Sequence, residues 1–146
     1  MHRRDFLSSL ALSATALTLP GVPEALAAAQ TLKFRELYVR GNDLTDKAKS
    51  LEGAEIEMIG YMAPPLKPEI DFFVLTKLPM STCPFCESEA QWPDDIVLAH
   101  ARGSLRVVRY TDLIRVQGRF ETGFQTDAET GFVSYVRLMD VRYEKL

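Results

Sequence analysis

The chain has 146 residues, 47% of them hydrophobic and 25% charged, and its formal net charge at neutral pH is −3. This is the composition of a globular protein, and the mildly acidic balance argues against a nucleic-acid-binding protein. No block of Lys and Arg is long enough to predict docking on anionic lipid.

The first 29 residues have the layout of a secretory signal. Four residues at its start carry the export pattern: Arg3, Arg4, Phe6 and Leu7. A short apolar stretch diluted by Ser and Thr continues to Leu19, and an Ala-rich cleavage region ends at Ala29. The arginine pair before Phe-Leu resembles the twin-arginine signal of bacteria, whose machinery transports folded proteins. We therefore predict a signal peptide over residues 1–29 and a periplasmic or otherwise exported domain over 30–146, with no stable membrane anchor after cleavage.

The exported part contains short apolar stretches separated by turn residues. Residues 32–39 predict a strand or a short helix, and residues 44–51 predict a short helix capped by Asn42 or Asp43. Strict alternation of apolar and polar residues predicts a half-buried strand over 55–62. Further strands are predicted over residues 70–76, 96–99, 113–120 and 132–143.

Five or six strands with one short helix predict a mainly β fold in a single domain. The length and the strand number suit a small closed or nearly closed antiparallel β-barrel. Gly60 and Gly118 lie within predicted strands, where a barrel needs sharp bends. The tetrapeptide Glu-Thr-Gly-Phe occurs at 121–124 and 129–132 and predicts two similar turns.

An ordered set of short motifs runs through residues 44–143. It consists of Leu51-Glu52-Gly53, a run from Ile56 through Gly60 to Pro64, Phe72-Phe73-Val74-Leu75, Cys83 and Pro93-Asp94-Asp95-Ile96. This order resembles a family of small exported bacterial proteins of unknown function that are related to OB-fold barrels. The resemblance implies an OB-like β-barrel over residues 30–146 and a location in the cell envelope.

Cys83 and Cys86 are the only cysteines, and His100 is the only histidine of the exported part. One chain therefore cannot assemble a zinc site from four Cys and His ligands. Two thiols separated by two residues can bind a soft metal such as zinc or copper, form a reducible pair, or pin a loop as an inert disulfide. These three alternatives remain open. Side chains that could support a metal are Glu87, Glu89, Asp94, Asp95 and His100.

This pattern assigns no catalytic residue and favours a binding or accessory protein over an enzyme. Our leading hypothesis is an envelope protein that binds zinc or copper through Cys83 and Cys86. The alternatives are a thiol-disulfide redox protein and a structural or protein-interaction domain with an inert disulfide. The expected partners are the twin-arginine export machinery and an envelope protein or a second copy of the chain.

Residues 102–119 are locally basic because they contain Arg102, Arg106, Arg109, Arg115 and Arg119. Outward-facing strand positions explain these arginines most simply. A surface that binds an anion or a partner is the alternative.

Overall fold

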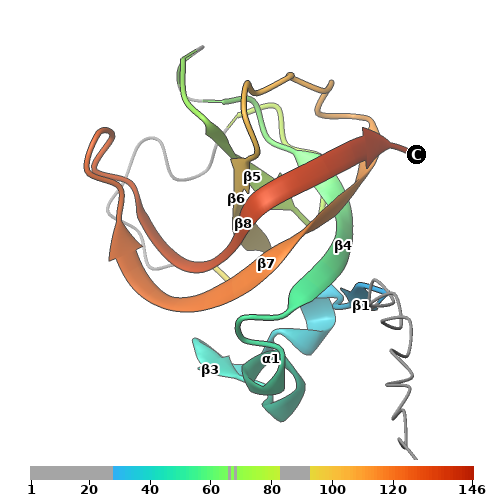
Figure 1. Cartoon of the computed structure of the whole chain (residues 1–146), viewed down its shortest axis with the longest axis vertical. Helices are drawn as coiled ribbons and strands as arrows, with labels where there is room; N and C mark the ends of the chain where they lie inside the picture. Colours follow the sequence, from blue (N-terminus) through green and yellow to red (C-terminus); the bar gives the residue numbers. More distant parts are fainter. Residues whose placement is uncertain (1–27, 66, 68, 83–92) are drawn as a thin grey trace, which may run out of the picture.

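The computed structural model describes residues 28–65, 67, 69–82 and 93–146. The predicted signal therefore lies outside the described residues except for Ala28 and Ala29, and the segment that contains both cysteines lies outside them entirely. The described elements, shown in Figure 1, are β1 Gln30–Thr31, η1 Phe34–Glu36, β2 Tyr38–Arg40, β3 Asp43–Leu44, α1 Asp46–Ser50, β4 Glu55–Met62, β5 Phe72–Thr76, β6 Ile96–Ala101, β7 Leu113–Thr126 and β8 Val133–Lys145.

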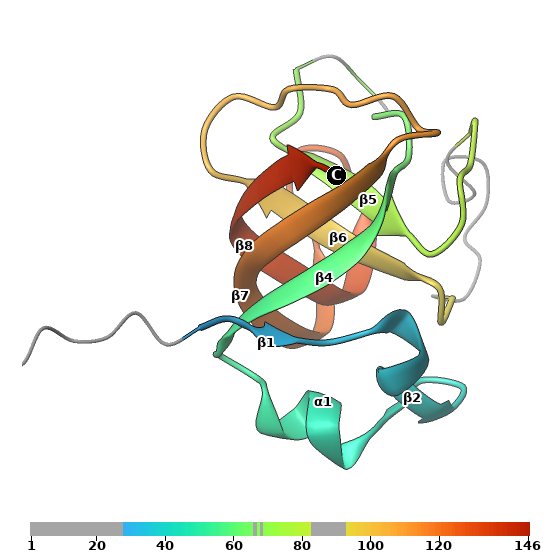
Figure 2. The ribbon, with the colours of Figure 1, turned by 90° about the vertical axis from the view of Figure 1, so that its right-hand side faces the viewer.

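Five strands pair in a ring. β4 pairs with β5, β5 with β6, β6 with β8 and β8 with β7, and β7 returns to β4. Figure 2 shows β4, β7 and β8 curving around a common interior. The predicted small β-barrel with one short helix is therefore confirmed. The sheet is mixed rather than purely antiparallel, because the long connection from β6 to β7 lets β8 meet β6 in the same direction.

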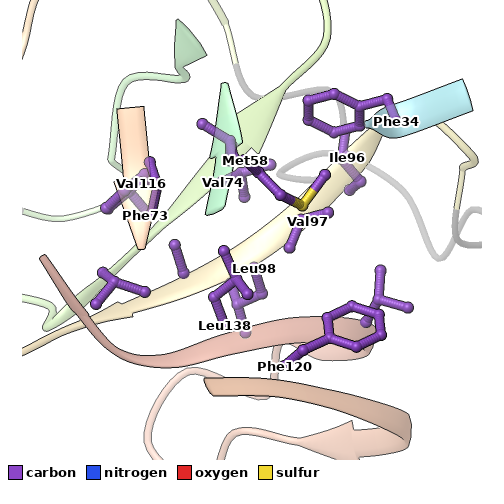
Figure 3. Packing of buried hydrophobic residues seen from close by; sticks show 14 of the residues in the cluster. Phe34, Met58, Phe73, Val74, Ile96, Val97, Leu98, Val116, Phe120 and Leu138 are labelled. Atoms are coloured by element: carbon purple, nitrogen blue, oxygen red, sulfur yellow. The ribbon is translucent and has the colours of Figure 1, made fainter. Parts of the chain in front are cut away.

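Alternating burial along the strands explains the ring. In β4 the residues Ile56, Met58 and Met62 are fully buried, whereas Glu55 and Ile59 at alternate positions are exposed. β5 is buried along its whole length, as its apolar sequence predicts. Figure 3 shows buried side chains of β4, β5, β6, β7 and β8 meeting in the interior. Removing this apolar surface from water is the main contribution to the stability of the barrel.

The segment before β4 differs from its prediction in detail. Residues 32–39 form η1 between two short strands, because Leu32 and Leu37 are both buried and require a turn between them. The predicted helix forms as α1, but its N-cap is Thr45 rather than Asn42 or Asp43. The Thr45 hydroxyl accepts a hydrogen bond from the Ala48 backbone N–H over 3.0 Å, which satisfies a free donor of the first turn.

β7 and β8 extend beyond their predicted bounds as a long hairpin. The first Glu-Thr-Gly-Phe lies inside β7 and is not a turn, which corrects that prediction. Instead, Gly123 has a φ of 99° where the register shifts between Thr122 and Gln125. The nearly buried Arg137 donates from Nη1 to the Gly123 carbonyl over 2.7 Å. This bond satisfies a carbonyl that the irregular pairing leaves free.

The two strand glycines are required by close approach of neighbouring backbone. A Cβ at Gly60 would lie 2.5 Å from the Thr76 carbonyl oxygen. A Cβ at Gly118 would lie 2.8 Å from the Met139 carbonyl oxygen, beside an irregular pairing of β7 with β8. The absence of a side chain therefore lets the neighbouring strands approach closely at both places.

The hairpin turn provides a pH-dependent test of the fold. Asp127 Oδ1 accepts hydrogen bonds from the Thr130 hydroxyl over 2.7 Å and the Thr130 backbone N–H over 2.8 Å. These bonds, the hydroxyl first, hold the pKa of Asp127 below its ordinary value. Asp127→Ala should lower the free energy of unfolding by about 1 kcal/mol at neutral pH.

A carboxyl with a lowered folded-state pKa stabilises the fold fully above its unfolded pKa of about 4, and this contribution is lost as pH falls through the folded value. The difference between wild type and Asp127→Ala should therefore shrink in urea titrations at decreasing pH. Glu129→Ala in the same turn is the control. A difference that stays constant down to pH values below the folded pKa would contradict this role of Asp127.

Candidate functional site

The two ends of the connection from β5 to β6, whose sequence contains both cysteines, lie side by side. Thr76 of β5 pairs with Ile96 of β6, and the next backbone hydrogen bond, from Lys77 N–H to the Asp95 carbonyl, measures 3.0 Å. The buried Thr76 hydroxyl lies 2.7 Å from the Leu78 carbonyl oxygen and fixes the first residues of the connection. The residues at the two ends of this connection are therefore held side by side.

A small pocket of about 120 Å³ lies where the two ends of this connection meet. It is lined by Phe34, Arg35, Tyr38, Lys77, Asp94 and Asp95. Within the described part of the chain, neither the two cations nor the two carboxylates of this lining form an ion pair with another side chain. The pocket therefore offers charged groups of both signs to a polar ligand or an ion.

η1 and β2 form one wall of the pocket, and contacts with the barrel and with α1 hold this wall in place. Phe34 is 7% exposed and packs over Gly60. The Glu36 carboxylate accepts a hydrogen bond from the Lys33 backbone N–H over 2.9 Å and pairs with Lys47 of α1 over 2.9 Å. The first of these bonds, followed by the contact with Lys47, lowers the pKa of Glu36. These contacts link the wall to both the barrel and α1.

Two of the predicted supporting residues meet at this pocket, since Asp94 and Asp95 both line it. Cys83, Cys86, Glu87 and Glu89 lie outside the described residues, as do the export residues Arg3, Arg4, Phe6 and Leu7. Among the residues that the structure describes, no group of three or more His, Cys, Asp or Glu side chains could hold a metal ion.

His100 lies away from Asp94 and Asp95. It is five residues beyond Asp95 along β6, a span of about 16 Å in an extended strand. Its ring centroid is 5.3 Å from that of Phe72, and its Nδ1 is 3.9 Å from Asp71 Oδ1. The structure thus brings the two carboxylates together and packs the histidine against an aromatic ring at the other end of the strand.

Sequence reasoning missed the other side chains that line the pocket. Arg35 and Tyr38 lie in the amphipathic stretch that the sequence places only as a strand or a helix. Lys77 follows β5 directly, and no motif marks it. Their proximity to Asp94 depends on the packing of η1 and β2 beside the ends of β5 and β6, which local sequence patterns do not encode.

Comparison with known proteins shows similarity at the level of the fold. No protein-family model matches the chain, and no curated protein matches it. The crystal structure of a DUF3299 family protein from Pseudomonas aeruginosa PAO1 is similar, with a TM-score of 0.54 and 14% sequence identity. The similarity covers 82% of this chain and 97% of that chain.

The described part of the chain contains no helix with the length and apolar character needed to cross a bilayer. At 14% identity, the likeness to the Pseudomonas protein shows a shared fold. This chain therefore has the fold of a bacterial protein that belongs to a family designated by number rather than by activity.

Proposed function

We propose that this protein is an exported binding or accessory protein of the bacterial cell envelope that binds zinc or copper through Cys83 and Cys86. The observation that carries the proposal is that the connection from β5 to β6, whose sequence contains both cysteines, begins and ends beside the pocket lined by Asp94 and Asp95. Thiolates favour zinc and cuprous copper, and carboxylates can complete the coordination of zinc.

The strand arrangement of the barrel supports the proposed OB-like fold. The ring order β4-β5-β6-β8-β7, which closes on β4, gives a five-stranded barrel of the size expected for that fold. The similarity to a DUF3299 protein is consistent with the proposed family of small bacterial envelope proteins. β1 begins at Gln30, directly after the predicted signal, which fits a mature chain that starts there.

Metal binding is tested on the reduced mature chain. We expect zinc or cuprous copper to bind with a dissociation constant below about 1 μM in a competition titration with a chromogenic chelator. The double variant Cys83→Ser, Cys86→Ser should lose this binding and retain its β-type circular dichroism spectrum. A matched control is Ser81→Ala, Ser88→Ala, which changes the same segment and leaves both thiols.

Two other outcomes would contradict the metal proposal. If Cys83 and Cys86 bind no metal and their reduction potential lies well above about −300 mV, the protein is a thiol-disulfide redox protein. If the two cysteines bind no metal and their reduction potential lies below about −300 mV, they form an inert disulfide. Asp94→Asn, Asp95→Asn should weaken zinc binding, and unchanged affinity would remove these carboxylates from the site.

Export is tested in the twin substitution Arg3→Lys, Arg4→Lys. The full-length precursor should accumulate in the cytoplasm, because the twin-arginine route recognises the arginines themselves and the substitution keeps the positive charge. Immunoblots of cell fractions measure this, with Asp5→Glu as the control. Unchanged export would indicate ordinary secretion, and envelope protein with an intact Met1 would contradict a cleaved signal.

A further inference from the structure

The five arginines of residues 102–119 fall into two groups in the structure. Arg115 and Arg119 lie on β7, where Arg115 pairs with Glu144 over 2.8 Å and Arg119 with Glu121 over 3.2 Å. Arg102, Arg106 and Arg109 lie on the irregular connection between β6 and β7, residues 102–112, and are exposed. None of these three forms an ion pair with another described residue.

Hydrogen bonds and core packing fix the backbone of this connection, so that its arginine side chains point outward. Tyr143 Oη accepts from the Arg106 backbone N–H over 2.7 Å and donates to the Arg106 carbonyl over 2.8 Å. The Val108 backbone N–H lies 3.3 Å from Met62 Sδ. Leu105 and Val108 pack against the core, so the residues between and beside them face away from it.

Exposed apolar side chains accompany the arginines. Val107 is 60% exposed, Tyr110 38% and Leu113 37%. Leu146 is 49% exposed and is joined to Leu113 by a backbone hydrogen bond of 2.9 Å. In Figures 1 and 2 this connection crosses the end of the molecule that lies opposite α1. The combination is a projecting loop with three cations, aliphatic side chains and a tyrosine.

From residue 102 to residue 111 the connection contains no acidic residue, and Asp112 at its end is paired with Lys145 over 3.0 Å. At the α1 end, by contrast, cations and carboxylates are interspersed along the chain. Within its own sequence the connection thus carries only positive charge before Asp112, and this charge is complementary to an anionic surface.

We infer that residues 102–112 form a docking loop for an anionic phospholipid membrane, although the sequence alone contains no continuous block of Lys and Arg that would predict one. Arg102, Arg106 and Arg109 contact headgroup phosphates, Val107 enters the edge of the acyl region, and Tyr110 lies at the interface, where its amphipathic ring is favoured. A projecting loop with an aliphatic tip between cations suits a lipid surface better than an acidic protein, which would need a groove or a free strand edge.

The docking loop is tested by sedimentation of the mature chain with vesicles. The described core begins at Leu32, so the apolar signal segment can be omitted and cannot itself bind lipid. We expect binding to vesicles of phosphatidylcholine mixed with phosphatidylglycerol, release at high salt, and little binding to phosphatidylcholine alone. Arg102→Gln, Arg106→Gln, Arg109→Gln should weaken binding about a hundredfold, because each arginine near an anionic surface strengthens binding about fivefold.

The matched control is Lys33→Gln, Arg40→Gln, Lys49→Gln, which removes the same charge from exposed positions in or beside η1, β2 and α1. It should bind almost as the wild type does, as should Cys83→Ser, Cys86→Ser, so this test is independent of the metal proposal. Val107→Asp should also abolish binding. Equal losses in the two triple variants, unchanged binding of Val107→Asp, or equal binding to both kinds of vesicle would overturn the inference. No binding to either vesicle would overturn it too and leave an acidic protein as the occupant.

Discussion

Met58→Asp is expected to unfold the mature domain. Met58 is fully buried in β4, opposite Val116 of β7, and Figure 3 shows its side chain in the barrel interior. An aspartate there would lose the apolar contacts of the thioether and place an unpaired charge in the core. The cost is on the order of 3–5 kcal/mol or more, a large part of the 5–15 kcal/mol that stabilises a typical domain. Circular dichroism and urea unfolding of the variant measure the loss.

The control for Met58→Asp is Ile59→Asp, which introduces the same side chain one residue later. Ile59 is 40% exposed on the outer side of β4 and is paired across the strands with Arg115, so its aspartate would remain in water beside a cation. Since successive strand residues face opposite sides, the two variants should differ sharply in the urea midpoint. Equal stability of the two would contradict the register of β4 and the ring closure built on it.

Gly60→Ala is expected to give the second large effect. The new Cβ would lie 2.5 Å from the Thr76 carbonyl oxygen and 3.1 Å from Phe34 Cε2. Because the nearest atom belongs to the backbone of β5, the strand itself must move, which costs about 1–3 kcal/mol in a packed interior. The free energy of unfolding should fall by this amount in urea titrations.

The same substitution should also disturb the candidate site, since Thr76 lies at the start of the connection from β5 to β6 and Phe34 lines the pocket. Metal affinity should therefore weaken along with stability. Ile59→Ala is the adjacent control that keeps the strand but adds no close contact. A Gly60→Ala variant with an unchanged urea midpoint would show that β4 and β5 do not approach as closely as described.

The parts of the fold that follow local patterns were predictable from the sequence. The alternation over residues 55–62 correctly indicates β4 and its buried face, and the apolar run before Lys77 indicates a strand buried on both sides. These features depend on neighbours in sequence, so their periodicity and residue types are sufficient to identify them.

Features that depend on tertiary closure were not predictable in the same way. The parallel pairing of β6 with β8 and the extension of β7 past Gly123 require partners far along the chain. The first Glu-Thr-Gly-Phe has the composition of a turn, but cross-strand pairing and the Arg137 hydrogen bond keep it within a strand. Tertiary contacts thus override a local turn preference here.

The candidate site likewise has one part that the sequence predicts and one part that only the structure shows. The Cys83 and Cys86 pair and the carboxylates Asp94 and Asp95 stand out in the sequence because their chemistry is distinctive. The pocket formed by Arg35, Tyr38 and Lys77 with those carboxylates emerges only when η1 is packed against the end of β5. Likewise, the sequence shows five arginines in one region, but only the structure separates the paired ones on β7 from the docking loop.

The most direct test of the proposed function is native mass spectrometry of the protein taken from the cell envelope without reductant, which records metal content and thiol state together. We predict bound zinc or copper, with Cys83 and Cys86 not linked to each other as a disulfide. The variant Cys83→Ser, Cys86→Ser, isolated in the same way, should carry no metal. A metal-free chain with a stable Cys83–Cys86 disulfide of very low reduction potential would contradict the account.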